Sequence, residues 1–274
     1  MIDVIVVSYN SAAVLTECIR SLLSSKLVHH IWIVNNSPLD RLPQFEARVS
    51  VLNPGSNLGF GPGVNYAASK VATNIVAIVN PDTVTSPGTL EACHRYLSSH
   101  EEVGILSPRV YVDGVLFPTS EHEFSFFRLL FEHLMPDRGM GIARTRRDHL
   151  RTHSTQALNG AFLVARAEVL NSIEWFDPSI FLFGEDADIC RRIRATGSKV
   201  VYLAEGRVDH VDGHAWKRNR PEESRRQRRS ARIEQLSRAR GKGSVTAYKF
   251  VLYLRDLVAD SWNLVLGRRA SRRV

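Results

Sequence analysis

Two adjacent carboxylates, Glu185 and Asp186, follow an aromatic segment and are candidates for acid–base chemistry. If one of the two is buried, its pKa rises, which is what a general base at neutral pH requires. Acidic residues at a helix N-terminus also cap free amides and complement the helix dipole, so a structural role is equally open. Asp188 with Arg191 or Arg192 is likewise explained as an ion pair on a helix surface.

Residues 80–83 read Asn-Pro-Asp-Thr and directly follow an apolar run at residues 75–79. A carboxylate at the end of a strand can hold Mg²⁺ or Mn²⁺ against a diphosphate, because these hard cations take oxygen ligands and keep several waters. Pro and Asp also favour turns for conformational reasons of their own. Asp82 is therefore a candidate metal ligand, with a plain turn as the competing interpretation.

A histidine, His210, follows a predicted strand and has Gly213 three residues further on. A lone histidine is usually structural or exposed, but one placed just after a strand in an α/β enzyme is well placed to bind a metal. His210 is thus a second candidate metal ligand.

The segment at residues 57–65 contains three glycines within five residues. Glycine permits positive φ and close backbone approach, and the N-terminus of the helix that follows can receive a phosphate. The spacing differs from the G-x-G-x-x-G fingerprint of dinucleotide-binding proteins, which disfavours a nicotinamide oxidoreductase.

Strands that alternate with helices must position these residues, and this alternation predicts an α/β fold with a mostly parallel sheet covered on both faces. In such sheets, ligands bind beyond the carboxyl ends of the strands. Residues 121–153 are interpreted as a helix followed by a mobile loop over the active site. The predicted strands lie at residues 2–7, 30–34, 49–52, 75–79, 104–108, 157–166 and 200–203, and the predicted helices at 12–23, 63–70, 88–98 and 187–196.

The composition is that of an ordinary globular protein, with 44% hydrophobic and 23% charged residues. The three cysteines, Cys18, Cys93 and Cys190, form no CxxC pair, which argues against a disulfide framework or a zinc site and fits a reducing cytoplasm. Residues 1–7 lack the basic start and the small-residue cleavage site of a signal peptide and are interpreted as a buried strand.

The positive charge of the chain lies in its C-terminal part. The formal net charge is +8, yet residues 217–274 alone hold 17 Lys/Arg against 5 Asp/Glu, and residues 1–216 hold 19 against 23. The body is therefore mildly acidic, and the basic tail suggests an anionic partner, either lipid head groups or nucleic acid.

The apolar stretch at residues 245–266 carries too many charges to span a membrane. A basic segment followed by an amphipathic helix favours attachment to an anionic membrane surface. The alternative is a helix that packs on the body or on a second copy of the chain in a homodimer. Nucleic-acid binding is disfavoured, because the aromatic residues of the tail do not lie among its arginines. The predicted apolar helix face consists of Phe250, Val251, Leu254, Leu257, Val258, Trp262 and Val265.

The order of these motifs resembles the family 2 glycosyltransferases, especially bacterial rhamnosyltransferase-like members. The resemblance spans residues 2–216, about four-fifths of the chain. The motifs that carry it are residues 7–10 (VSYN), 34–37 (VNNS), 57–60 (NLGF) with Asn65, 80–83 (NPDT), 159–161 (NGA), 176–177 (FD), 185–192 (EDADICRR) and 210–213 (HVDG).

This resemblance implies a GT-A fold of the α/β class, with a mostly parallel central sheet, flanking helices and a C-terminal helical extension. Residues 1–216 would form the glycosyltransferase domain, with a nucleotide-binding part at about 1–110, an acceptor-binding part at about 111–216, and a tail at 217–274. Asn35 stands where the family usually has an aspartate that contacts the base, so either the recognition of a pyrimidine would be altered, or Asn36 or Asp40 would substitute for the aspartate. The other implied nucleotide contacts are Ser8, Tyr9, Asn10, Asn57, Asn80 and Asp82.

The resemblance also implies the chemistry. Asp82 matches the last carboxylate of the family's metal motif, and with His210 it would bind Mg²⁺ or Mn²⁺. Asn80 stands where some members have another aspartate. Asp186 would be the catalytic base, with Glu185 as its nearest competitor, and a single displacement would invert the anomeric configuration.

The implied donor is dTDP-rhamnose, with a UDP-sugar as the alternative, and the implied acceptor is a glycan or a polyprenyl-linked glycan for cell-surface polysaccharide. Such an enzyme would be cytoplasmic and peripheral on the inner face of the plasma membrane. A nucleotidyltransferase is disfavoured, because residues 8–11 hold no basic side chain. A non-catalytic sugar-binding relative is disfavoured by the presence of both Asp82 and the acid pair.

Overall fold

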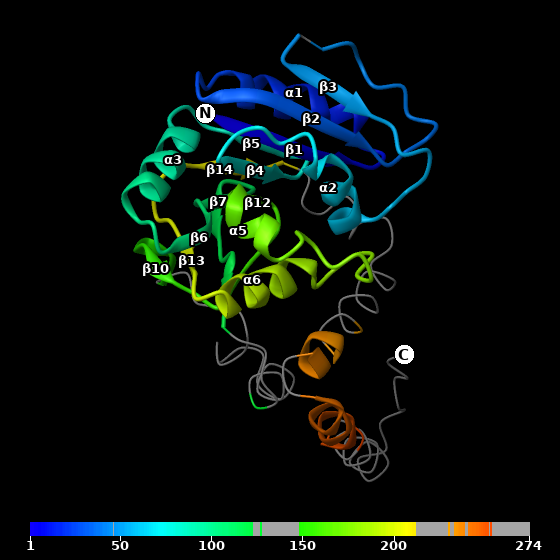
Figure 1. Cartoon of the computed structure of the whole chain (residues 1–274), viewed down its shortest axis with the longest axis vertical. Coiled ribbons are helices and arrows are strands. Elements are labelled where there is room, and N and C mark those ends of the chain that lie inside the picture. The colour runs from blue at the N-terminus through cyan, green and yellow to red at the C-terminus, as the bar shows by residue number, and fades with distance from the viewer. Residues whose placement is uncertain are drawn as a thin grey trace, which may run out of the picture.

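A large twisted sheet forms the centre of the molecule, with helices on both faces (Figure 1). The structure is a computed structural model of the whole chain, and it describes residues 1–45, 47–122, 127, 148–211, 230, 233–238, 241–251 and 253. The expected aromatic helix and loop at residues 121–153 therefore lie largely outside the described residues.

The central sheet has eight strands in the order β10-β13-β6-β12-β4-β1-β2-β3. Six of them run in one direction, while β12 and β10 are antiparallel to their neighbours. The expected mostly parallel sheet is thus confirmed, with one reversed strand inserted between β4 and β6. The strands are β1 (Ile2–Ser8), β2 (Val28–Asn35), β3 (Val49–Leu52), β4 (Ile75–Val79), β6 (Val103–Ser107), β10 (His153–Ser154), β12 (Phe162–Arg166) and β13 (Lys199–Tyr202).

Two smaller sheets extend the fold beyond the central one, with strand orders β5-β14-β7-β8 and β11-β9. The strand predicted at residues 157–166 is in fact two strands, because the chain turns at residues 159–161. His210 was expected after a strand but is the last residue of one. The strands are β5 (Thr83–Thr85), β7 (Val110–Val112), β8 (Val115–Phe117), β9 (Ser120–Glu121), β11 (Ala157–Leu158) and β14 (Val208–His210).

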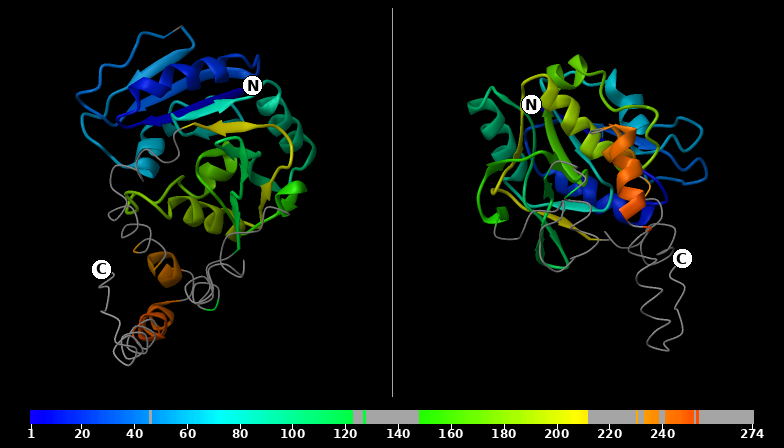
Figure 2. Two further views of the ribbon diagram at one scale, coloured as in Figure 1. Left: turned by 180° about the vertical axis from the view of Figure 1, so that it is seen from behind. Right: turned by 90° about the horizontal axis from the view of Figure 1, so that it is seen from below.

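The helices divide between the two faces of the sheet (Figure 2). Alternate residues of β1 point to opposite faces, so Val4 and Val6 pack with α1 and α3, while Ile5 and Val7 pack with α2, α5 and α6. Both faces are therefore buried, as a parallel sheet requires. The helices are α1 (Ala12–Leu23), α2 (Phe60–Ala68), α3 (Thr89–Ser99), α5 (Ala167–Ser172), α6 (Glu185–Ala195) and the short 3₁₀ helix η2 (Asp148–Leu150).

Two helices begin earlier than the apolar spacing predicted, and a glycine precedes each. Gly59 has φ +88° before α2, and Gly184 has φ +90° before α6. These left-handed conformations turn the chain sharply into the helix. As a result, α6 starts at Glu185, and both Glu185 and Asp186 lie in its first turn.

The cysteines confirm the expectation of a chain without disulfides. All three thiols are free and buried in the core. Burial raises the pKa of Cys18 and of Cys190 to about 12 and that of Cys93 further. The thiols therefore stay protonated and act as small apolar side chains.

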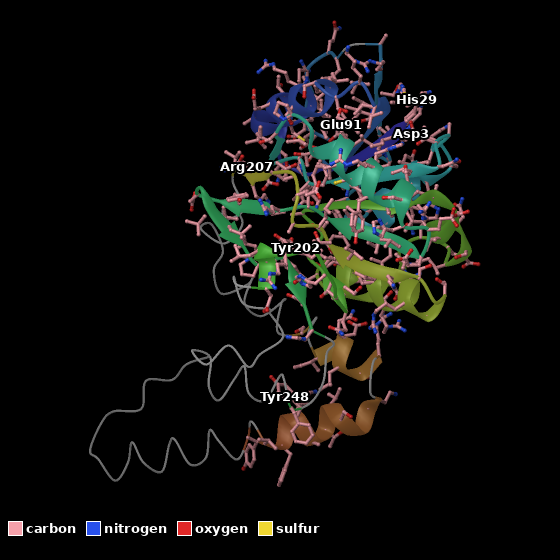
Figure 3. All side chains as sticks on the ribbon, turned by 90° about the vertical axis from the view of Figure 1, so that its left-hand side faces the viewer. Asp3, His29, Glu91, Tyr202, Arg207 and Tyr248 are labelled. Carbon is pink, nitrogen blue, oxygen red and sulfur yellow. The ribbon has the colours of Figure 1, made fainter. Side chains whose placement is uncertain are left out.

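The described part of the tail consists of short helical stretches, at residues 233–238 and 242–251. Leu236 is buried in the same apolar cluster as Phe176 and Ala187 of the body, and so is Tyr248, which is labelled in Figure 3. These two tail residues thus pack on the body, as one of the expected alternatives proposed. Among the residues that the structure describes, no helix is both long and apolar enough to cross a membrane.

Candidate active site

The carboxyl ends of β1 and β2 lie side by side and carry the first predicted pocket residues. The two strands are in parallel register, with Ser8 opposite Asn35, and the amide of Asn36 donates to the carbonyl of Ser8 at 2.8 Å. Asn10 has φ +52° and is held by Ser37, whose hydroxyl donates to Asn10 Oδ1 at 2.9 Å. This tight arrangement leaves the ring of Tyr9 exposed at the end of the sheet.

The two asparagines after β2 have different environments. Asn35 Nδ2 donates to Asn53 Oδ1 at 3.2 Å, and Asn35 Oδ1 accepts from the amide of Ser37 at 3.1 Å, so its side chain organises the surrounding loops. Asn36 Nδ2 donates to the carbonyl of Gly59 at 2.8 Å, while its buried Oδ1 has no hydrogen-bond partner in the described part of the chain. Buried polar atoms without partners are rare and require an explanation such as a ligand.

The glycine segment serves close packing. A Cβ atom on Gly59 would lie 2.2 Å from the carbonyl oxygen of Phe181, and one on Gly61 would lie 2.9 Å from Phe176 Cβ. The amide of Phe60, at the start of α2, donates to the same Phe181 carbonyl at 3.1 Å. The N-terminus of this helix was expected to be able to receive a phosphate, and the structure assigns its first amide to a protein carbonyl instead. Asn57 is exposed, and its Oδ1 accepts from the amide of Gly59 at 3.0 Å.

Both predicted metal ligands come together, although 128 residues separate them. His210 Nε2 lies 3.0 Å from Asp82 Oδ1, because β14 pairs with β5 next to Asp82. The pairing is extended by the amide of Val211, which donates to the Asp82 carbonyl at 2.9 Å. Both side chains are largely buried.

No group of three or more His, Cys, Asp or Glu that could hold a metal occurs among the described residues. Mg²⁺ and Mn²⁺ accept few protein ligands when a diphosphate and water complete the shell. The Asp82–His210 pair therefore fits a cation that is bound together with a nucleotide diphosphate.

The acid pair at the start of α6 meets a turn from a distant part of the chain. The amide of Gly160 donates to Asp186 Oδ2 at 3.2 Å, and the amide of Ala187 donates to Asp186 Oδ1 at 2.8 Å. Glu185 is buried, and its Oε2 has no partner in the described part of the chain. Burial and the neighbouring charge of Asp186 raise the pKa of Glu185 to about 8.

The turn at residues 159–161 links the acid pair to the segment that precedes Asp82, a predicted metal ligand. The carbonyl of Ala161 accepts from the amide of Asn80 at 3.0 Å, one residue after the Gly160 amide contacts Asp186. Asn159 Oδ1 accepts from the Ala161 amide at 3.1 Å and so stabilises the turn. The motif at 159–161 was present in the sequence, but no spacing rule indicated that its amides would contact Asp186.

Other acidic and amide side chains near the site have structural roles. Asp188 pairs with Arg191 at 2.6 Å and with Arg192 at 2.8 Å, which confirms the expected ion pair, although Asp188 is fully buried rather than on the surface. Asn65 exchanges hydrogen bonds with the backbone of Phe176, at 2.8 and 3.0 Å, and so ties α2 to the segment before α6.

Comparison with known proteins places this chain among the glycosyltransferases. A family model described as "Glycosyltransferase like family 2" matches residues 2–231. An N-acetylglucosaminyl-diphospho-decaprenol L-rhamnosyltransferase of Mycobacterium tuberculosis is 24% identical over 237 residues, which cover 78% of this chain and 77% of the relative.

Solved structures of similar fold include a crystal structure of GalNAc-T7 with UDP, GalNAc and Mn²⁺, at a TM-score of 0.60 and 13% identity. The match covers 77% of this chain and 43% of the GalNAc-T7 chain, so this chain spans less than half of that protein. S. aureus TarS 1–349 in complex with UDP matches at a TM-score of 0.54 and 16% identity, over 86% of this chain and 70% of TarS 1–349. These likenesses confirm the expected α/β fold of the GT-A type.

Proposed function

The chain belongs to the family 2 glycosyltransferases, and from this premise we propose that it transfers L-rhamnose from dTDP-rhamnose to a polyprenyl-linked glycan with inversion at the anomeric carbon. The observation that carries the proposal is the turn at residues 159–161, which joins Asp186 to the segment of Asp82. The likeness to a decaprenol-linked rhamnosyltransferase supports this donor and acceptor. The UDP-bound relatives support a UDP-sugar as the alternative donor.

Asp186 is the proposed general base. It removes a proton from the acceptor hydroxyl while that oxygen forms a bond to the anomeric carbon from the face opposite the diphosphate. The bond from the anomeric carbon to the diphosphate oxygen breaks, and the electron pair leaves with the diphosphate. Two backbone amides donate to the two oxygens of Asp186, which orients the carboxylate.

Glu185 is the weaker candidate for the base. A carboxyl whose pKa is raised to about 8 carries its proton at neutral pH and cannot accept another. We propose that Glu185 stays protonated beside Asp186 and thereby avoids a buried negative charge next to a second carboxylate. This assignment leaves Asp186 as the carboxylate that accepts the proton.

Asp82 and His210 are the proposed protein ligands for Mg²⁺ or Mn²⁺. When bound, the cation would neutralise charge that develops on the leaving diphosphate. The two side chains contact each other across the β5–β14 pairing, so they are held in place before any donor arrives. The presence of Mn²⁺ in the GalNAc-T7 structure supports the use of a divalent metal.

The proposed nucleotide pocket lies at the carboxyl ends of β1 and β2. Three buried atoms there, Ser8 Oγ, Asn36 Oδ1 and Asp40 Oδ2, have no hydrogen-bond partner in the described part of the chain. A nucleotide could satisfy all three, whereas the side chain of Asn35 is already engaged with neighbouring loops. We therefore assign the base contact to Asn36 or Asp40 rather than to Asn35. Tyr9, Asn10, Asn57 and Asn80 remain the other proposed contacts.

The tail is proposed to attach the enzyme to the inner face of the plasma membrane, where a polyprenyl-linked acceptor is located. On the helix of residues 242–251, Lys242 and Lys249 are exposed together with Phe250, which is 60% exposed. Tyr253 follows it and is 62% exposed. Lysines beside exposed aromatic rings suit the interface of an anionic bilayer.

The donor is tested first by thermal denaturation with dTDP, UDP, dTDP-rhamnose and UDP-GlcNAc, each with and without Mn²⁺ or Mg²⁺. A ligand at 100 times its Kd stabilises a protein by about 2.7 kcal/mol. For a domain of this size, that corresponds to a rise in Tm of roughly 5–10 °C. We expect the largest rise with dTDP compounds and metal. A larger rise in Tm with UDP compounds would mean that the donor is a UDP-sugar and not dTDP-rhamnose. No rise in Tm with any nucleotide would contradict the transferase proposal.

Transfer is then measured with dTDP-[¹⁴C]rhamnose and a short-chain polyprenyl-diphospho-GlcNAc acceptor. Incorporation of label into the lipid would support the full proposal. Donor binding without transfer to any lipid-linked or free glycan acceptor would favour the non-catalytic sugar-binding alternative.

Membrane attachment is tested by flotation with vesicles that contain anionic or only zwitterionic lipids. We expect the chain to float with anionic vesicles and the Phe250→Ser/Tyr253→Ser variant to float less. Flotation that is equal for both proteins, or absent for both, would contradict attachment through this helix. If the wild-type chain instead forms a concentration-dependent dimer and the variant does not, the result would favour the homodimer.

A further inference from the structure

The loop at residues 177–184 leads directly into the acid pair, and its first residue is held by the tail. Arg238 Nη1 donates to Asp177 Oδ2 at 2.5 Å, and Arg238 Nη2 donates to Ser179 Oγ at 3.1 Å. The Ser179 hydrogen bonds and the Arg238 guanidinium lower the pKa of Asp177 to about 2. Because Asp177 stays ionised above this pH, the ion pair persists under every condition in which the enzyme would be assayed.

The last residue of the same loop is held by the same tail helix. A Cβ atom on Gly184 would lie 3.0 Å from Gln235 Nε2 and 3.2 Å from Gln235 Cγ. The side chain of Gln235 therefore packs directly on the backbone of Gly184, and it is only 4% exposed. The carbonyl of Gly184 in turn accepts from the amide of Asp188 and opens α6 at the acid pair.

Between these two ends, the loop contacts the nucleotide-binding half of the molecule and has an unfavourable conformation. The carbonyl of Phe181 accepts from the amide of Phe60 at 3.1 Å. Phe183 has φ +66°, a left-handed conformation that costs a side-chain-bearing residue about 1–3 kcal/mol. Phe181 is also 54% exposed, so burial of its ring contributes little to holding the loop. A loop of this kind keeps one conformation only when its surroundings impose it.

The tail helix at residues 233–238 is itself firmly placed against the body. Leu236 is fully buried in the cluster that contains Phe176 and Ala187, and Arg238 is braced by Glu234 at 2.8 Å. Figure 1 shows this helix, in orange, next to α6. The match to the family model ends at residue 231, so the tail residues that make these contacts lie outside the part of the chain shared with that model.

We infer that Gln235 and Arg238 are positioning residues for transfer: the tail helix clamps both ends of the 177–184 loop and so sets the place of Glu185 and Asp186 relative to the turn at 159–161. This inference rests on the proposed function, because it assigns these contacts a part in that reaction. A displacement of about 1 Å at a reacting group can lower a rate by roughly 100-fold, so a clamp outside the site can control turnover.

The test compares Arg238→Ala, Arg238→Lys and Gln235→Ala with Arg95→Ala as the matched control. Arg95 forms an exposed ion pair of 2.9 Å with Glu205, away from this loop. We expect Arg238→Ala to lower kcat about tenfold or more while donor KM changes less than about threefold. Arg238→Lys should recover part of that loss, because it keeps the charge beside Asp177, and Arg95→Ala should stay within about twofold of the wild type.

Hydrogen exchange of the backbone amides gives a readout that does not depend on activity. In Arg238→Ala and Gln235→Ala we expect faster exchange at residues 178–186 and unchanged exchange in α3 at residues 89–99. Arg95→Ala should leave exchange at residues 178–186 unchanged. If Arg238→Ala does not fold, Arg238→Lys and Gln235→Ala carry the same comparison.

Unchanged exchange at residues 178–186 in Arg238→Ala and Gln235→Ala, or a kcat within about twofold of the wild type for both, would overturn the inference. A wild-type enzyme that transfers no sugar would contradict the proposed function instead. In that case the exchange experiment still decides whether the tail clamps the loop.

Discussion

The nucleotide side and the acid-pair side of the proposed site are built in different ways. On the nucleotide side, Ser8 and Asn35 face each other because β1 and β2 are adjacent parallel strands, and the next hydrogen bond joins Asn36 to Ser8. On the acid-pair side, Asp186 is held by the amide of Gly160, and the loop before it is held by Arg238.

The nucleotide side is built mainly on backbone pairing between strands, and the acid-pair side is built mainly on contacts of side chains. On the nucleotide side, backbone pairing of β1 and β2 sets the frame, and the side chain of Asn36 adds a contact to Gly59. On the acid-pair side, the contacts are made by the side chains of Asp186 and Arg238. We therefore expect substitutions on the nucleotide side to change donor or metal binding and substitutions on the acid-pair side to change turnover. The predictions that follow test this division.

The largest effect is expected for Asp186→Asn. Loss of a general base lowers the rate by roughly 100- to 10,000-fold, and asparagine keeps the shape of the side chain. We expect kcat to fall by about this factor while the thermal stabilisation by the donor diphosphate stays unchanged. If Asp186→Asn transfers sugar near the wild-type rate and Glu185→Gln loses activity, then Glu185 and not Asp186 is the general base.

The next effect is expected for Asp82→Asn, on the other side of the site. Substitution of residues that only hydrogen-bond to metal ligands lowers metal affinity or activity about 10- to 100-fold. Removal of the charge of a ligand itself should lower them by at least as much. We expect the metal-dependent part of the donor's thermal stabilisation to disappear, and His210→Ala to show a smaller loss. Stabilisation that still depends on metal in both variants would contradict this metal site.

Gly59→Ala tests the place where the two sides touch. The added Cβ would meet the Phe181 carbonyl at 2.2 Å and force φ +88° on alanine, so we expect the free energy of unfolding to fall by about 2–4 kcal/mol. Gly55→Ala is the matched control, because Gly55 has φ +84° but nothing within 4 Å of its Cβ position. It should lower the free energy of unfolding by about 1 kcal/mol in urea titrations. Equal losses would mean that the contact with Phe181 is unimportant.

The smallest effect is expected for Glu185→Gln, as a change in pH dependence. The pKa of Glu185 is raised from 4.5 to about 8, so the folded chain holds this proton more tightly than the unfolded chain. The resulting stability is fully present below pH 4.5 and is lost as the pH rises through about 8. At pH 9 the variant should therefore be more stable than the wild type by at least about 1 kcal/mol, or roughly 2–4 °C in Tm.

At pH 4 the two proteins should melt at nearly the same temperature, because Glu185 is then protonated in the folded and largely in the unfolded chain, and it resembles glutamine. A difference in Tm that is the same at pH 4 and pH 9 would show that the substitution acts through packing and not through the charge.

Several features of the fold could be predicted from the sequence because they depend on local periodicity. The predicted helix at residues 12–23 and the strand at 75–79 have the bounds found for α1 and β4. The order of the motifs indicated the family, and the match over residues 2–231 confirms it. Asp82 and His210 were selected by residue type and by their place near strand ends, and the structure brings them to 3.0 Å.

The sequence alone thus determined the class of fold and the family, and it supplied the candidate site residues, because residue type and local spacing carry that information. Only the tertiary structure decided that the glycines serve close packing, that Asn35 is engaged by its own loops, and that Gly160 and Arg238 hold the acid-pair side. These contacts join segments far apart in the chain. They depend on how whole elements pack together, and no local pattern of residues specifies that packing.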